Sequence, residues 1–176
     1  MKKFLTVLVA ALLGVGAYAQ DWYVGGSFAL SGTKDSGFGI AIAPDFGYCI
    51  SDNLNVGAII GFGNANAAFS SALGGDDSFT PGETSWEFCP YLRYIPFSQG
   101  IVSFFTDACV DVYGGKDSLG DSYSGLVVGI NPGLSIELSD NFSVDFTLGL
   151  IGYDTELQTF GLSVGRVSSI GFYYAF

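Results

Sequence analysis

The feature that most constrains this chain is a period-2 alternation of side chains that runs through most of it. In each of eight segments every second position is uncharged and largely aromatic or branched aliphatic, and all of these positions are even-numbered. Side chains that alternate in this way lie on opposite faces of a β-strand. We therefore expect eight strands, with the apolar even positions at 22–30, 38–48, 54–62, 86–94, 102–112, 126–136, 142–150 and 170–176.

The odd positions between them are mostly small or polar, and they carry the charges. A soluble barrel places bulky apolar side chains inside, whereas here the charge-free face is the bulky one. Eight strands leave a lumen just wide enough for side chains, so small and polar residues suit the inside and bulky ones suit contact with lipid. We predict an all-β, eight-stranded antiparallel up-and-down transmembrane β-barrel, with a soluble periplasmic barrel around an apolar ligand as an alternative. The charged residues expected in the lumen are Arg93, Glu87, Asp107, Asp111, Glu137, Asp145 and Asp45.

The first nineteen residues have the composition of a cleaved signal peptide. Lys2 and Lys3 precede an apolar stretch, residues 4–15, and Ala17-Tyr18-Ala19 fits the rule for signal peptidase. The apolar stretch is about a dozen residues, short of the roughly 20 that a spanning helix needs. We expect cleavage between Ala19 and Gln20 and a single barrel domain at 20–176.

The composition of the exported chain excludes one class of partner. Two of the six Lys and Arg residues leave with the signal, so four bases face seventeen acids and the net charge is near −13. Such a chain repels nucleic acid, so no nucleic-acid partner is expected. Disorder is excluded for most of the chain because 49% of its residues are hydrophobic and 16% are aromatic.

The connections between the expected strands alternate in length. Short turns are expected at 51–53, 96–100 and 139–141, and longer loops at 31–37, 64–85, 114–123 and 152–167. Short turns are typical of the periplasmic side of such barrels and long loops of the outside, which places both termini in the periplasm. Aromatic residues near the strand ends are candidates for interfacial girdles: Trp22, Tyr48, Trp86, Tyr94 and Tyr174.

One hairpin recurs within the chain. The pattern from Pro44 through Ser51-Asp52-Asn53 repeats from Pro132 through Ser139-Asp140-Asn141, at a spacing of 88 residues. Because proline cannot donate a ladder hydrogen bond, we expect bulges at three mid-strand prolines, Pro44, Pro90 and Pro132. Arg166 breaks the charge-free phase, so we expect the last membrane strand to begin near Ser169.

These motifs carry a resemblance to a known family. The two Ser-Asp-Asn turns, the stretch 90–94 and the aromatic ending 171–176 resemble small outer-membrane β-barrel proteins with an OmpA-type or OmpX-type barrel, in particular the porin-family proteins of Bacteroidetes. The resemblance implies residence in a Gram-negative outer membrane among its lipids. The C-terminal Phe176 resembles the last residue of the family's C-terminal signal, which the barrel-insertion machinery recognises.

No residue set in the chain predicts catalysis. The chain contains no histidine, which excludes Ser-His-Asp and Cys-His sites and most zinc sites, so we expect no enzyme activity, cofactor or metal. The lumen charges predict either a hydrogen-bonded plug centred on Arg93 or a cation-attracting passage. We expect a structural or surface-interaction barrel whose loops contact an unknown extracellular ligand, and the alternative is a narrow porin-like passage for ions or small solutes.

The three cysteines leave a further choice open. Cys49, Cys89 and Cys109 all fall in the inward phase. An exported protein meets an oxidising compartment, so a disulfide is possible, and Cys89 and Cys109 on neighbouring strands form the plausible pair. The other reading is three buried free thiols that act as small apolar fillers.

Overall fold

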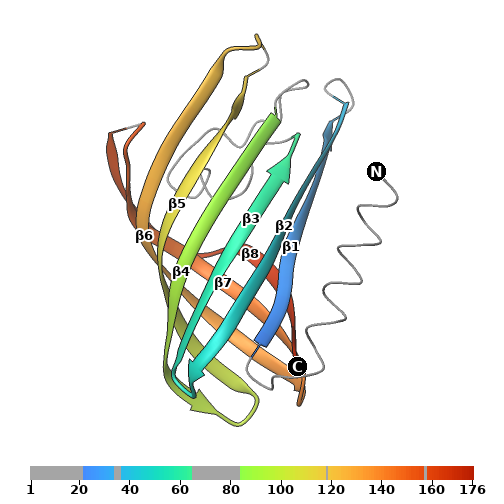
Figure 1. The fold of residues 1–176 in the computed structure, drawn as a ribbon, viewed down its shortest axis with the longest axis vertical. Helices are drawn as coiled ribbons and strands as arrows, with labels where there is room; N and C mark the ends of the chain where they lie inside the picture. The colour runs from blue at the N-terminus through green and yellow to red at the C-terminus, as the bar shows by residue number, and fades with distance from the viewer. Residues whose placement is uncertain (1–21, 34–36, 65–83, 118, 157) are drawn as a thin grey trace.

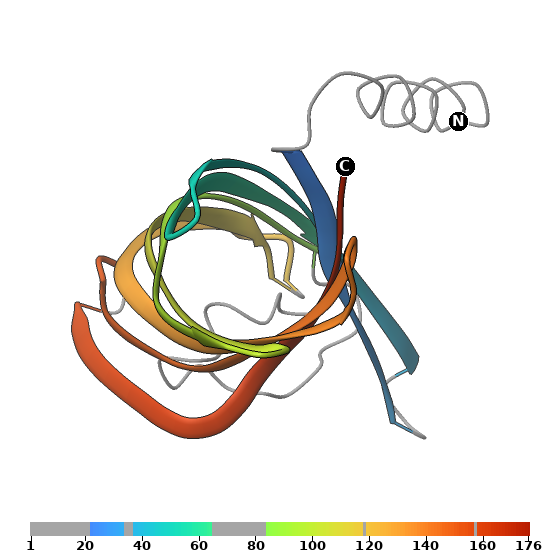
Figure 2. The same cartoon turned by 90° about the horizontal axis from the view of Figure 1, so that it is seen from below.

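The computed structural model describes residues 22–33, 37–64, 84–117, 119–156 and 158–176, and for 29–33, 37–39 and 163–168 it describes the backbone. Eight antiparallel strands close into a barrel in chain order (Figures 1 and 2). The expected all-β, eight-stranded fold is confirmed. The predicted signal peptide and its Ala19–Gln20 cleavage site lie outside the described residues. The strands are β1 (Trp22–Thr33), β2 (Gly37–Ser51), β3 (Leu54–Gly63), β4 (Thr84–Gln99), β5 (Val102–Lys116), β6 (Ser122–Ser139), β7 (Phe142–Asp154) and β8 (Thr159–Ala175).

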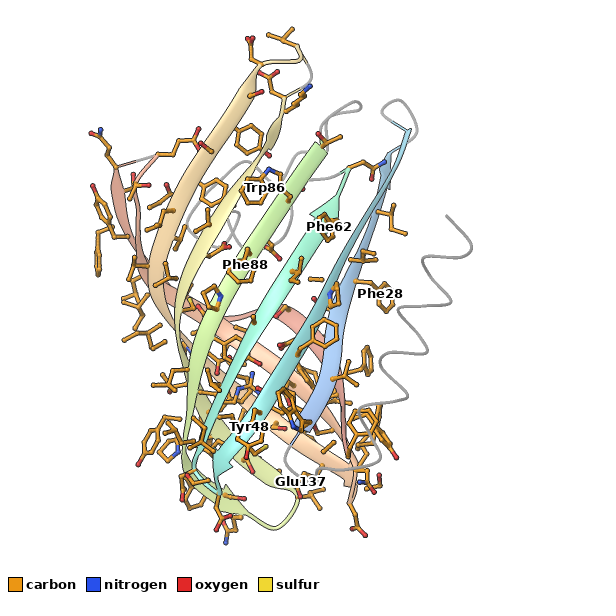
Figure 3. All side chains as sticks on the ribbon, in the orientation of Figure 1. Phe28, Tyr48, Phe62, Trp86, Phe88 and Glu137 are labelled. Atoms are coloured by element: carbon orange, nitrogen blue, oxygen red, sulfur yellow. The ribbon has the colours of Figure 1, made fainter. Side chains whose placement is uncertain are left out.

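The alternation read from the sequence becomes an alternation of burial. In β4, Phe88 and Leu92 are each 45% exposed on the outer face, whereas Cys89 between them is 1% exposed. Figure 3 shows Phe28, Phe62, Trp86 and Phe88 on the outside of the wall. Within the described residues, no helix has the length and hydropathy that a membrane-spanning helix requires.

The two ends of the barrel differ in their connections. At the turn end, which is the lower end in Figure 1, two residues join β2 to β3, β4 to β5 and β6 to β7. The loop end holds the other four connections. The connection between β7 and β8 is much shorter than the expected loop at 152–167, because β7 continues to Asp154 and β8 begins at Thr159. The expectation that the last strand begins near Ser169 is therefore wrong.

The repeated Ser-Asp-Asn turn fastens each hairpin to the strand that follows it. The side-chain amide of Asn53 donates to the carbonyl of Ile95 at 2.8 Å, and that of Asn141 donates to the carbonyl of Ala175 at 2.9 Å. The backbone amides of Ile95 and Ala175 in turn donate to the carbonyls of Asn53 and Asn141. A register shift stands just before both turns, between Cys49 and Ser51 and between Glu137 and Ser139. The 88-residue repeat is thus a repeat of structure.

The mid-strand prolines behave in two ways. The β6–β7 register shifts between Ile130 and Gly133, so the bulge expected at Pro132 is confirmed. At Pro44 and Pro90 the expectation is wrong, because the neighbouring ladders pass from Ile42 to Asp45 and from Phe88 to Tyr91 without a change of register. At Pro44 and Pro90 the missing donor leaves a gap in the ladder, but neither strand contains an extra residue.

The alternation changes phase in β7. The register between β7 and β8 passes from Thr147↔Ser169 to Gly149↔Val164, so two steps on β7 face five on β8. Gly149 has a φ of 147°, a value that favours glycine. Beyond this bulge Leu150 is 1% exposed and Ile151 is 37% exposed. The expectation that Leu150 faces outward is therefore wrong, since the bulge inverts the two faces.

The seam that closes the barrel is its shortest ladder. β1 and β8 pair from Tyr23↔Ala175 to Gly26↔Phe172, whereas the β1–β2 ladder runs from Trp22 to Thr33. Gly26, at the last pair of the seam, has a φ of 151°. The seam therefore closes the barrel at the turn end, and β1 follows β2 beyond it.

Among the described residues, six large aromatic side chains point into the lumen, which the interpretation of a small and polar inner face missed. Each lies over the glycine directly opposite it on the neighbouring strand, at a point where a Cβ would overlap the ring. The space for a ring in a narrow lumen thus comes from the absence of a side chain on the next strand. The pairs are Tyr23 with Gly47, Tyr91 with Gly57, Phe105 with Gly133, Tyr113 with Gly125, Tyr123 with Gly115 and Tyr173 with Gly25.

This packing predicts the effect of a single methyl group. Gly133→Ala places a Cβ against the ring of Phe105, and overpacking of this kind costs about 1–3 kcal/mol of stability. Ala108→Val enlarges an exposed position on the outer face of β5, so it should change stability by less than about 0.5 kcal/mol. Urea unfolding of the two variants measures both effects, and equal unfolding midpoints would contradict the packing described here.

Candidate functional site in the lumen

A single guanidinium connects opposite walls of the lumen. Arg93 on β4 donates from Nε and Nη2 to the two carboxylate oxygens of Asp107 on β5, at 2.7 and 2.9 Å. From Nη1 it donates to Oδ2 of Asp145 on β7, at 2.5 Å. Its Cζ lies 3.8 Å from the centre of the Phe105 ring. Because all four residues are buried, their side chains form a packed layer across the barrel.

A second hydrogen-bonded chain crosses the lumen beside this layer. The hydroxyl of Tyr91 on β4 donates to the carboxylate of Asp45 on β2 at 2.9 Å. The hydroxyl of Tyr23 on β1 lies 2.7 Å from that of Tyr91. All three side chains are buried, so this chain ties β4 to the first two strands as Arg93 ties it to β5 and β7.

Toward the loop end, the buried acids are less well compensated by hydrogen bonds and opposite charges. Asp111 is 0% exposed, and neither of its carboxylate oxygens has a hydrogen-bond partner among the described residues. Glu87 is buried on the neighbouring strand, where it occupies the space over Gly61. Farther up, the hydroxyl of Tyr113 donates to Asp154 at 2.9 Å. Asp154 was assigned to a loop from the sequence and belongs to the lumen instead.

At the turn end the lumen opens into a cavity of about 600 Å³. Glu137 lies in its wall near the lower end of the barrel and is exposed, unlike the other expected lumen acids (Figure 3). Arg93, Phe105 and Tyr173 also line the cavity, and its lining includes none of the buried Cys89, Tyr91 and Cys109 from farther in. The layer around Arg93 is therefore the inner end of the cavity, which we call the turn-end cavity.

The structure thus groups the seven charged residues expected in the lumen into four places. Arg93, Asp107 and Asp145 meet in one ion network, Asp45 joins the tyrosine chain beside it, and Glu137 lies in the turn-end cavity. Glu87 and Asp111 stand above, toward the loop end. Sequence reasoning missed the aromatic part of the site. The sequence contains the glycines that face these rings, but the pairs can be recognised only when the strand register is known.

The cysteines are unbridged in the structure. Cys89 and Cys109 are 1% and 3% exposed and belong to one apolar cluster with Tyr23 and Tyr91, and Cys49 packs against it. The thiol of Cys109 lies 3.5 Å from the carbonyl of Gly129. This arrangement favours the reading in which the thiols fill space between larger side chains.

No part of the described chain presents a metal centre. Among the described residues, no group of three or more Cys, Asp or Glu side chains is arranged to hold an ion. Asp117, an acid of the β5–β6 loop, is occupied otherwise: its Oδ1 accepts from the backbone amides of Leu119 and Asp121, at 2.9 and 2.8 Å. Its carboxylate therefore shapes the loop.

Comparison of the chain with protein-family models and with curated proteins found no match. The geometry of the barrel is therefore what indicates its function. That geometry shows a lumen closed by buried ion pairs and hydrogen bonds, with a cavity below them.

The Arg93 network predicts a large and specific loss of stability. Arg93→Met leaves Asp107 and Asp145 buried without their counter-charge, and breaking a buried pair in this way costs about 3–5 kcal/mol. Adding Asp107→Asn and Asp145→Asn should restore part of that loss, because the unpaired charges are then gone. Lys116→Met, at an exposed end of β5, is the matched control and should change stability by less than about 0.5 kcal/mol. Urea unfolding compares the three, and a neutral Arg93→Met would contradict the network.

Proposed function

We propose that the chain is an integral outer-membrane β-barrel protein that serves as a structural or surface-interaction scaffold. The observation that carries the proposal is the outer face of the wall. Large apolar side chains on it are about 40–65% exposed, among them Phe28, Phe62, Phe88 and Ile130. Soluble monomers rarely expose a continuous apolar surface of this kind, and a lipid-facing band requires one.

Aromatic residues at both ends of this face support the proposal. Trp22 and Tyr48 lie with their ring centres 5.0 Å apart at the turn end, and Tyr174 and Phe176 follow at 5.2 Å. Trp86 is 43% exposed toward the loop end. Rings at both limits of an apolar band are typical of side chains that sit at the level of lipid headgroups. In this proposal the turn end and both termini face the periplasm.

The interior favours a scaffold over a passage. The layer that runs from Arg93 to Asp145 crosses the lumen, and the side chains that form it are almost fully buried. A rigid, filled barrel holds its outer loops in fixed positions, which suits recognition of an extracellular ligand. The acids on either side of this layer favour the second candidate, a narrow cation-selective passage, only if the layer opens.

The membrane proposal predicts an asymmetric effect of one added charge. Val110 is outward on β5, between the levels of Trp86 and Tyr94, and arginine near the bilayer midplane costs about 2–4 kcal/mol. Val110→Arg should therefore reduce the heat-modifiable, sarkosyl-insoluble protein recovered in the outer-membrane fraction. Leu138→Arg, beside a turn, is the control and should not. If the unaltered protein extracts in buffer alone, or if Val110→Arg behaves as the control does, the chain is not a membrane barrel.

The choice between scaffold and passage is decided in planar lipid bilayers. The purified protein should give no stable single channels, because Arg93, Asp107 and Asp145 are bonded across the lumen. Arg93→Met, if it folds, should show whether opening this layer creates conductance. Stable cation-selective channels from the unaltered protein would replace the scaffold by the passage.

A further inference from the structure

The turn-end cavity has no role in a scaffold, and its lining has a definite chemical character. The acids Asp52, Glu137, Asp140 and Asp145 line it, together with one base, Arg93. Arg93 adds little positive charge to the cavity, since its guanidinium is paired with Asp107 and Asp145. The lining therefore keeps a negative charge, which attracts cations and repels anions.

Two carboxyl groups in the wall have oxygens without a partner among the described residues, one of them exposed and the other buried. The carboxylate of Glu137 is exposed and has no hydrogen-bond or ion-pair partner among the described residues. Asp145 is 4% exposed and uses Oδ2 for Arg93, while its Oδ1 has no hydrogen-bond partner among the residues that the structure describes. A buried polar atom without a partner is costly, so it points to a donor that is absent from the protein itself.

The rest of the lining indicates what kind of cation fits. A volume of about 600 Å³ lies within the range of small-molecule sites and far exceeds that of a bare ion. The described acids are not grouped as metal ligands. Aromatic rings and hydroxyl groups stand among the carboxylates, and together they suit an ammonium group, which donates hydrogen bonds and is attracted to ring faces. These lining residues include Tyr23, Tyr48, Tyr173, Ser103, Ser135 and Ser143.

We propose that the turn-end cavity is a binding site for a small organic cation that carries primary ammonium groups, of the polyamine class. Glu137 pairs with an ammonium group near the mouth. The inner wall, at Asp145 and the tyrosine rings, accepts the deeper part of the molecule. Because Arg93 and Phe105 close the inner end, the ligand enters and leaves by the mouth of the cavity alone.

Calorimetric titration of the purified, folded protein in detergent with spermidine, at about 0.15 M salt to screen exposed charges, tests this site. We expect saturable binding of one spermidine per chain. Magnesium chloride and a neutral polyol of similar size should show no saturation. Glu137→Gln should weaken the affinity about fivefold, as expected for the loss of one partly exposed ion pair, and Glu137→Asp should retain most of it.

Asp121→Asn is the matched control, because it removes an exposed acid at the loop end, far from the cavity. It should leave the affinity unchanged. An equal loss with Asp121→Asn, or equal binding of magnesium, would mean that general charge and not the cavity attracts the cation. Absence of saturable binding would also overturn the proposal. Heat-modifiable gel mobility shows whether each variant is folded, and the titration does not depend on membrane location, so its failure leaves the membrane proposal standing.

Discussion

The width of an eight-stranded lumen is the constraint on which the rest of the structure depends. Such a lumen has room for side chains and little else, so a ring on one strand requires an empty place on the next. Glycine supplies that place opposite each of the six inward aromatic residues that the structure describes, and opposite Glu87 at Gly61. The abundance of glycine in this chain is thus a packing requirement of large inward side chains, placed residue by residue through the strand register.

The same narrow space sets the electrostatics. A guanidinium in a filled lumen must be paired, and Arg93 meets this need by reaching one carboxylate on its neighbouring strand and another across the barrel. Its flat group also stacks on Phe105, so charge and packing act together at one level. Buried ion pairs of this kind add little net stability over apolar packing. What they do here is join β4 to its neighbour β5 and, across the lumen, to β7.

Much of this architecture could be predicted from the sequence, because alternation with a charge-free face runs through most of the strands. The number of strands, their order and the turn positions follow from it. The phase change at Gly149 could not be predicted, since a bulge adds residues without any periodic signal and inverts the faces that follow. The inward tyrosines were missed for a related reason. The large side chain of Tyr91 fits the lumen because the register places it opposite Gly57. Register is a property of two strands, so it cannot be read from the pattern of one strand.

The layer around Arg93 affects both the proposed cation site and the choice between a closed barrel and a passage. If this layer is permanent, ions cannot traverse the lumen, and the negative charge below it cannot be relieved from the loop end. A blind cavity with unpaired carboxylate oxygens then remains, and it is accessible from the turn end of the barrel only. A passage would instead need Arg93 to leave Asp145, and that motion would remove the inner wall of the cavity. Closure of the barrel and recognition of a cation at its turn end therefore favour each other, whereas conduction and recognition compete for the same side chain.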